Sequence, residues 1–122
     1  AEQLFRRMVL NVMARNCDDH TKNFAFTMDK TGKWRLSPAY DICHAYRPNS
    51  EWVSYHALSI NGKRRGIERK DLKNVAYQMN IKKPEEIIDQ VADVVSNWRG
   101  YAEKTQVNGK LLSAIEKTLI VL

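Results

Sequence analysis

The polar residues that can do chemistry are concentrated in one short segment and one acid further along the chain. The segment reads Asn-Cys-Asp-Asp-His-Thr-Lys-Asn over residues 16–23, and the later acid is Asp41. Phosphoryl transfer needs a carboxylate that accepts a hydroxyl proton, oxygen ligands that hold Mg²⁺ on the phosphates, and a cation near the moving group. Groups of all these kinds occur here, so the segment predicts phosphoryl transfer.

The spacing of these residues follows the order of the protein-kinase catalytic loop. In that loop the base Asp precedes a magnesium-binding Asn by five residues, and a second magnesium-binding Asp comes later in the chain. Here Asp18 lies five residues before Asn23, a hairpin pattern follows, and Asp41 comes next. Asp18 is the predicted base, and Asn23 and Asp41 are the predicted Mg²⁺ ligands. Lys22 is predicted to supply positive charge near the phosphate, and His20 to brace the loop by hydrogen bonding.

Each of these residues also has a structural interpretation. Asp18 and Asp41 can cap helix or turn amides, and Asn23 can end the loop before a strand. Lys22 needs no catalytic role, since an exposed lysine beside acids is common. Asp19 is predicted to cap a turn rather than to bind magnesium.

A zinc site is the second chemistry that these residue types suggest. Two residues separate Cys17 from His20, and Cys43 is followed directly by His44. Structural zinc sites usually leave several residues between the ligands of a pair, and adjacent side chains seldom reach one ion together. We therefore do not expect zinc here.

The densest group of basic residues begins just past the middle of the chain. This basic cluster is a candidate surface for phosphate, RNA or an acidic protein, and a solvated face explains it equally well. The net charge of +6 agrees with either interpretation. The basic cluster consists of Lys63, Arg64, Arg65, Arg69, Lys70 and Lys73.

The segment of residues 16–23 lies between a predicted helix and a predicted hairpin. Apolar residues recur with a helical period over residues 1–15, which predicts an amphipathic helix. Residues 24–28 and 33–36 have the pattern of two paired strands, and Gly32 in the turn can take a positive φ. Pro38 ends the second strand, because it has no amide hydrogen to donate.

The rest of the chain is predicted to be mostly helical. A short strand is expected over residues 55–60, and Trp34 and Trp98 are expected in the core. The fold class is therefore mainly α with a small β-hairpin, in one domain over residues 1–122. The three predicted helices have their apolar faces over residues 72–79, 84–98 and 111–119.

The composition is that of an ordinary soluble domain. Hydrophobic residues make up 43% of the chain and charged residues 28%, which argues against disorder. The apolar runs are too short for a membrane span, and Arg6 and Arg7 interrupt the first of them, unlike a signal peptide. Two cysteines are too few for a disulfide scaffold, which predicts a reducing, cytoplasmic location.

Two stretches of the chain resemble the signature of the HipA family. They read Asn-Cys-Asp-Asp-His-Thr-Lys-Asn-Phe-Ala-Phe over residues 16–26 and Trp-Arg-Leu-Ser-Pro-Ala-Tyr-Asp-Ile over residues 34–42. Residues 58–63, Leu-Ser-Ile-Asn-Gly-Lys, look like a further family segment. The Asp-x-His-x-x-Asn arrangement also resembles phosphatidylinositol kinases. The resemblance implies the helical C-terminal lobe of a HipA-type, protein-kinase-like fold.

The same resemblance implies an activity and partners. It implies a serine/threonine protein kinase that uses ATP and Mg²⁺ and acts as a toxin. The family's substrates include aminoacyl-tRNA synthetases, and family members also phosphorylate themselves. The partner it implies is a HipB-like antitoxin of the helix-turn-helix, DNA-binding kind.

The chain departs from ordinary kinases in several features. Lys22 lies four residues after the predicted base rather than two, and Asp41 is followed by Ile42 and Cys43 rather than Phe-Gly, as in the HipA family. The chain contains no G-x-G-x-x-G loop and no strand lysine paired with a helical glutamate. We therefore expect an N-terminal ATP-binding lobe in cis or in trans, and little activity from this chain by itself.

Two other hypotheses remain open. The chain can be a non-catalytic basic module that binds a protein or a nucleic acid. It can also be one subunit of a split kinase, with the ATP-binding lobe on a separate chain. The presence or absence of an ATP-binding lobe distinguishes these hypotheses from a conventional kinase.

Overall fold

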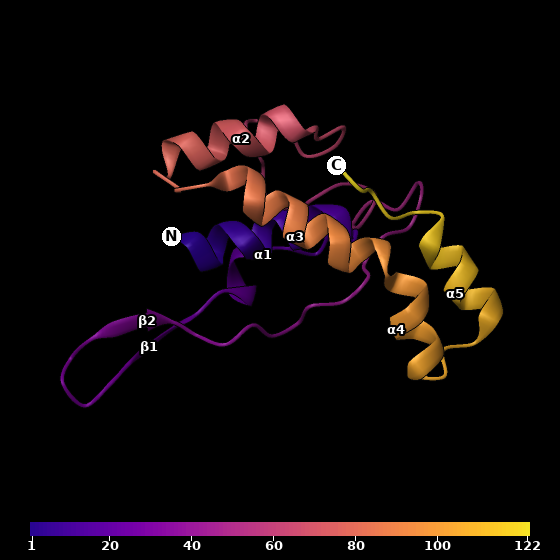
Figure 1. The fold of residues 1–122 in the computed structure, drawn as a ribbon, viewed down its shortest axis with the longest axis horizontal. Helices are drawn as coiled ribbons and strands as arrows, with labels where there is room; N and C mark the ends of the chain where they lie inside the picture. The colour runs from indigo at the N-terminus through magenta and orange to yellow at the C-terminus, as the bar shows by residue number, and fades with distance from the viewer.

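The elements of the structure follow the predicted order of helix, hairpin and helical C-terminal half. The computed structural model describes all 122 residues. It is mainly helical with one antiparallel hairpin, which confirms the predicted fold class (Figure 1). None of the helices has the length and apolar character needed to cross a lipid bilayer. The elements are α1 (Glu2–Met13), the 3-10 turn η1 (Thr21–Asn23), β1 (Phe26–Met28), β2 (Trp34–Leu36), α2 (Arg69–Gln78), α3 (Pro84–Ser96), α4 (Trp98–Lys104) and α5 (Gly109–Glu116).

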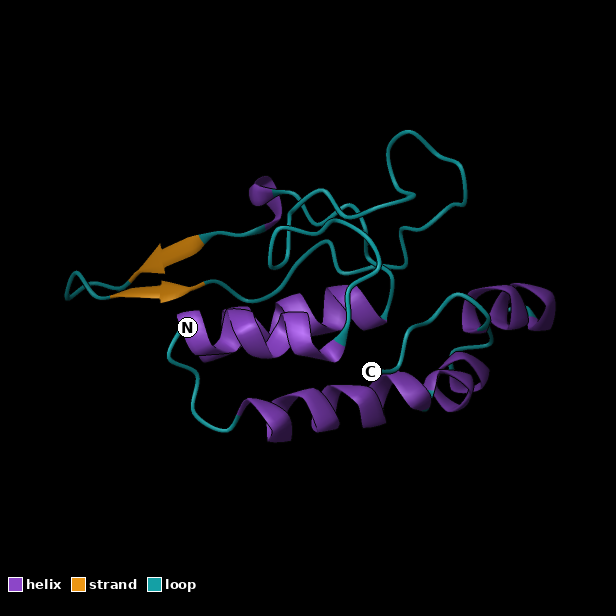
Figure 2. Ribbon diagram, turned by 90° about the horizontal axis from the view of Figure 1, so that it is seen from above, coloured by secondary structure: helices purple, strands orange, loops and turns teal.

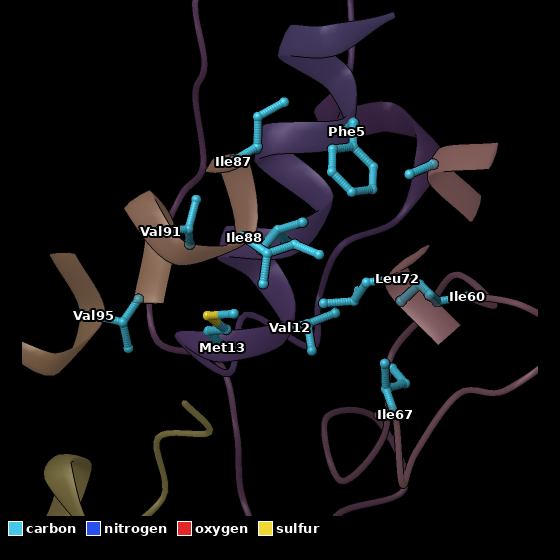
Figure 3. Packing of buried hydrophobic residues seen from close by; sticks show 12 residues of the cluster. Phe5, Val12, Met13, Ile60, Ile67, Leu72, Ile87, Ile88, Val91 and Val95 are labelled. Carbon is cyan, nitrogen blue, oxygen red and sulfur yellow. The ribbon is translucent and has the colours of Figure 1, made fainter. Parts of the chain in front are cut away.

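The hydrophobic core is built where α1 packs along α3 (Figure 2). Both helices turn an apolar face toward the other, as their sequence periods predict. Ile88 of α3 lies near the middle of the cluster, and Leu72 of α2 closes one side (Figure 3). Burying each large apolar side chain contributes about 1.5–3 kcal/mol. The cluster consists of Phe5, Val9, Val12, Met13, Ile60, Ile67, Leu72, Ala76, Ile87, Ile88, Val91 and Val95.

The hairpin is held by its own turn. The Oδ1 atom of Asp29 accepts hydrogen bonds from the Thr31 hydroxyl at 2.6 Å and from the Lys33 amide at 3.1 Å. The Thr31 hydroxyl is the main cause that lowers the pKa of Asp29. Gly32 takes a φ of 81°, which confirms the predicted turn. The two strands are each shorter than the patterns predicted, because only three residue pairs are bonded across them.

The hairpin extends past the helices (Figure 2), and its aromatic side chains are exposed. Trp34, a predicted core residue, is 64% exposed, so that prediction is wrong. Phe26 on the facing strand is 61% exposed. A two-stranded ribbon offers its side chains only their cross-strand neighbours to pack against. The hairpin therefore presents an uncovered apolar surface.

The strand predicted over residues 55–60 is absent. The amides of Ala57 and Leu58 donate to the carboxylate of Asp19 at 2.8 and 3.2 Å instead of to a neighbouring strand. Only an isolated bridge forms nearby, between Ile60 and Lys63. A strand does not form here because these backbone donors already have acceptors in and near Asp19.

The C-terminal half contains one more helix than predicted. The helix expected over residues 84–98 ends at Ser96, and α4 begins after Asn97. Asn side chains compete for backbone hydrogen bonds, so they favour helix ends over helix interiors. Trp98 is half-buried, and its Nε1 donates to the Leu112 carbonyl at 3.2 Å, which ties α4 to α5.

Candidate functional site

The end of α1 sets the course of residues 16–23, which carry the predicted catalytic residues and which we call the catalytic loop for that reason. The Arg15 amide donates to the Val12 carbonyl at 3.4 Å, and the Asn16 amide donates to the Asn11 carbonyl at 2.9 Å. These two bonds form a Schellman motif, in which the residue after the C-cap is left-handed. Arg15 has a φ of 59°. The chain therefore turns sharply out of the helix before the first residue of the loop.

Asn16 joins the catalytic loop to the segment that carries Asp41. The Asn16 side chain is buried, and its Nδ2 donates to the Asp41 carbonyl at 3.3 Å. The backbone strengthens this junction, because the Cys17 amide donates to the Ala45 carbonyl and the Ala45 amide donates to the Arg15 carbonyl, both at 3.0 Å. Asp41 is thus held beside the loop although 25 positions separate it from Asn16.

Asp18 presents a free carboxylate at the start of the loop. Its side chain is 53% exposed, and the Nε2 atom of His20 lies 3.8 Å from Oδ1. That separation is longer than a hydrogen bond. Asn23 Nδ2 donates to the Asp18 carbonyl at 3.0 Å, so the Asn23 amide closes the loop. The Asn23 Oδ1 atom accepts no hydrogen bond from the chain, and it remains available to a ligand.

Desolvation raises the pKa of the Cys43 thiol, and the charges of Asp41 and Asp18 both raise it further. Asp41 is exposed with a φ of 52°, and its carboxylate has no partner in the chain. The Asp41 carboxylate therefore extends from a segment whose backbone is held beside the loop that carries Asp18.

Lys22 lies on the exposed side of the loop, and its ammonium forms no ion pair with an acid of the chain. The Tyr40 hydroxyl donates to the Lys22 carbonyl at 2.8 Å. This bond is a second connection between the catalytic loop and the residues next to Asp41. The Lys22 ammonium is free to meet a phosphate, and its catalytic role remains a prediction.

A buried Asp19–His56 pair braces the catalytic loop. His56 Nδ1 lies 3.0 Å from Asp19 Oδ2, and the two side chains are only 3% and 4% exposed. Asp19 Oδ1 also accepts from the amides of Ala57 and Leu58. The His20 imidazole makes no hydrogen bond, and its Nδ1 is buried without a partner. The bracing expected of His20 therefore comes from His56, and Asp19 is a long-range anchor rather than a turn cap.

Sequence reasoning missed His56. The histidine lies 37 positions from Asp19, and no local spacing connects the two. One signal was present, because His56 precedes residues 58–63, which resemble a segment of the HipA family. A buried carboxylate such as that of Asp19 needs several hydrogen-bond donors. The segment that begins at His56 supplies them through its imidazole and the next two backbone amides.

Most of the basic cluster is neutralised within the chain. Lys63 Nζ lies 2.8 Å from Asp71 and Arg69 lies 2.6 Å from both Glu85 and Asp89. Lys70 and Lys73 pair with Glu68 and Glu85 at 2.8 and 2.7 Å. Arg64 donates its Nε to the His56 carbonyl and stacks over Tyr55. The basic cluster therefore connects α2 to its neighbours, and this arrangement disfavours a nucleic-acid surface there.

The Lys63 partner is itself a tightly held acid. Asp71 is buried, and it accepts hydrogen bonds from Lys63 and Asn61 at 2.8 Å and from the Glu68 amide at 2.9 Å. These donors, Lys63 first, hold the pKa of Asp71 well below its usual range. Asp71 is ionised at neutral pH and links the 61–68 segment to the first turn of α2.

The zinc interpretation gains no geometric support. Cys17 is buried and Cys43 is exposed, and neither forms a disulfide. Burial raises the pKa of Cys17 to about 11, so its thiol stays protonated at neutral pH. No three side chains of the His, Cys, Asp and Glu types converge as a metal cage. His44 instead contacts the Thr118 hydroxyl through Nε2 at 2.8 Å.

A comparison with known proteins identifies one family. The family model described as "HipA-like C-terminal domain" matches residues 1–98. The match includes the catalytic loop, the hairpin, Asp41, and the helices α1 to α3. No curated protein and no solved structure matches the chain.

Proposed function

The chain belongs to the family of HipA-like C-terminal domains, and on that premise we propose that it is the C-terminal lobe of a serine/threonine protein kinase. The reaction is transfer of the ATP γ-phosphate to a protein hydroxyl. One observation carries the proposal: Asn16 and the Cys17–Ala45 backbone bond hold Asp41 beside the loop that contains Asp18 and Asn23. Kinase chemistry needs these three residue types in one place.

Asp18 is the proposed base. Its carboxylate is exposed and has no hydrogen-bond donor in the chain, so it can approach a substrate hydroxyl. It would orient that hydroxyl and accept its proton as the oxygen attacks the γ-phosphate. Lys22, which is also unpaired, would offset negative charge on the transferred group.

Asn23 and Asp41 fit a magnesium ion by the chemistry of their free atoms. The Asn23 Oδ1 and the Asp41 carboxylate accept no hydrogen bond within the chain. Mg²⁺ prefers oxygen ligands and usually takes one or two protein groups together with water and phosphate oxygens. When bound there, the ion would neutralise charge on the ATP phosphates.

The hairpin is the proposed contact with an ATP-binding lobe, supplied in cis or in trans. A hollow of about 610 Å³ lies between α1 and the hairpin, lined by Leu4 and Arg7 on one side and Phe26, Trp34 and Leu36 on the other. Exposed apolar side chains grouped in this way usually mark an interface. We therefore place the second lobe against this surface, and the split-kinase arrangement stays compatible with it.

The family premise extends the proposal to partners. We propose a protein substrate of the aminoacyl-tRNA synthetase kind and a HipB-like, DNA-binding antitoxin. Both cysteines are unpaired, which supports a reducing cytoplasm as the site of action.

The decisive experiment removes the base alone. In the protein that contains the ATP-binding lobe, Asp18→Asn is expected to lower the phosphorylation rate by about 10²–10⁴-fold, because general-base catalysis contributes that much. Asp93→Asn is the matched control, since Asp93 is exposed on α3 and makes no hydrogen bond or ion pair. Radiolabel transfer from ATP measures the rate, and melting temperature checks the fold. Full activity of Asp18→Asn would refute Asp18 as the base.

A further inference from the structure

A polar hollow lies apart from Asp18, Asn23 and Asp41. It has a volume of about 350 Å³, and only one of its lining residues is hydrophobic. Arg15 approaches it from the end of α1, Tyr46, Asn49 and Ser54 from the loop after the hairpin, and Arg65 from the segment before α2. Its two charged residues are both arginines, and no acid lines it. The hollow is therefore an open, positively charged depression in the surface.

Neither arginine is neutralised elsewhere. Arg69 and Arg99 each reach a carboxylate at 2.6 Å, which shows how an arginine of this chain is neutralised where an acid lies within reach. Arg15 and Arg65 form no ion pair with any acid, and Arg15 Nε is buried without a hydrogen-bond partner. A buried donor without an acceptor is costly, so it is rare in folded proteins. The two terminal nitrogens of the Arg15 guanidinium also make no hydrogen bond within the chain, and they are the atoms that an acceptor in the hollow can reach.

The Arg15 side chain is also held in place. Its guanidinium carbon lies 3.6 Å from the centre of the Tyr46 ring, so the planar group is stacked and oriented. Arg15 occupies the left-handed position of the α1 cap with a φ of 59°, a position usually taken by glycine. The cap does not need the side chain. The arginine at this position therefore serves the hollow rather than the helix end.

We propose that this hollow binds a single phosphate group that carries two negative charges, either on a phosphorylated side chain or as free phosphate. A guanidinium offers paired N–H donors that match phosphate oxygens, and two of them balance two charges. The Asn49 amide and the Ser54 hydroxyl can supply neutral donors. A polynucleotide is disfavoured, because it needs an extended basic track and four of the six residues of the basic cluster are ion-paired. The site does not depend on phosphoryl transfer at Asp18.

Calorimetric titration of the chain with O-phosphoserine and with inorganic phosphate tests the proposal. Arg65→Gln removes an exposed guanidinium without altering packing, and Arg15→Gly removes the other while placing the preferred residue at the α1 cap. Each variant is expected to weaken phosphate binding by about tenfold or more, the value of a charged hydrogen bond. Arg47→Gln is the control, since Arg47 is an exposed arginine of the same loop that does not line the hollow.

The relative affinities for the two phosphate compounds distinguish the source of the phosphate. Tighter binding of O-phosphoserine than of inorganic phosphate supports a phosphorylated side chain, and equal binding supports free phosphate. Absence of binding to the unaltered chain, or equal losses in Arg65→Gln and Arg47→Gln, overturns the proposal. Binding of a short DNA duplex that also falls in Arg47→Gln overturns it as well, because that result indicates a diffuse basic surface. Melting temperatures of all the variants exclude unfolding as the cause.

Discussion

The helical core and the catalytic loop are held together by different kinds of interaction. The core joins α1 to α3 through apolar side chains such as Phe5 and Ile88, which are completely buried. The loop depends on a few polar contacts instead, chiefly the Asp19–His56 pair and the Asn16 amide. Apolar packing spreads stability over many atoms, whereas a buried polar pair concentrates it in a few. The loop is therefore the region in which one substitution has a local effect.

The largest effect is expected from a core truncation. Phe5→Ala removes a fully buried ring from α1, and it should lower the free energy of unfolding by about 3–5 kcal/mol. Urea unfolding followed by circular dichroism measures the loss. Val94→Ala, on the exposed face of α3, is the control and should change stability by less than about 0.5 kcal/mol. Similar losses in both variants would contradict the assigned core.

A smaller and more local effect is expected from the loop brace. His56→Ala leaves the buried Asp19 carboxylate without its imidazole partner, which should cost about 1–3 kcal/mol. Hydrogen exchange is expected to accelerate at the Ala57 and Leu58 amides while α1 and α3 keep their protection. Tyr55→Ala changes an adjacent half-buried residue, and it tests whether any substitution in this segment accelerates exchange at the same two amides. Uniform loss of protection along the chain would show that loop and core form one cooperative unit.

Acid should weaken the connection between the 61–68 segment and α2. The pKa of Asp71 is held well below its usual range by Lys63 and Asn61, so its ionised form favours the folded state. That stabilisation is present above the unfolded-state pKa near 3.8 and is lost as the pH falls toward the folded-state pKa. The stability advantage of the unaltered chain over Asp71→Asn should therefore shrink between pH 5 and pH 2. A difference independent of pH would exclude ionisation of Asp71 as its source.

The smallest effect is expected from the exposed ion pairs of the basic cluster. Lys73 is 52% exposed, and its pair with Glu85 should contribute about 0–1 kcal/mol. Lys73→Ala should leave the midpoint of urea unfolding nearly unchanged. Added salt should remove any remaining difference in midpoint between this variant and the unaltered chain. A loss as large as that of His56→Ala would mean that these surface pairs carry more of the fold than their exposure indicates.

Most features set by residues close together in the chain were predicted correctly, and features set by distant contacts were not. The helices α1 and α3 were predictable because their apolar residues recur with a helical period over three turns or more. The hairpin was predictable because Asp29 and Gly32 have local turn chemistry. The exposure of Trp34 was not, since it depends on what the neighbouring elements leave uncovered.

The candidate site divides in the same way. The types and order of Asp18, Asn23 and Asp41 predicted phosphoryl-transfer chemistry without any coordinates. Their proximity depends on the bonds of Asn16 and Ala45, which no local spacing reveals. The roles of the arginines show the contrast most directly, since Arg69 is neutralised by Glu85 whereas Arg15 and Arg65 face a hollow together.

The mainly helical fold class, the turn of the hairpin and the chemical types present in the catalytic loop could all be predicted from the amino-acid sequence. These features follow from periodicity and from contacts between residues near one another in the chain. Three further features required the folded structure: the pairing of His56 with Asp19, the position of Asp41 beside the loop, and the identity of the unpaired basic residues. These outcomes depend on where distant loops return, and the pairing of polar groups in three dimensions has no period that a sequence displays.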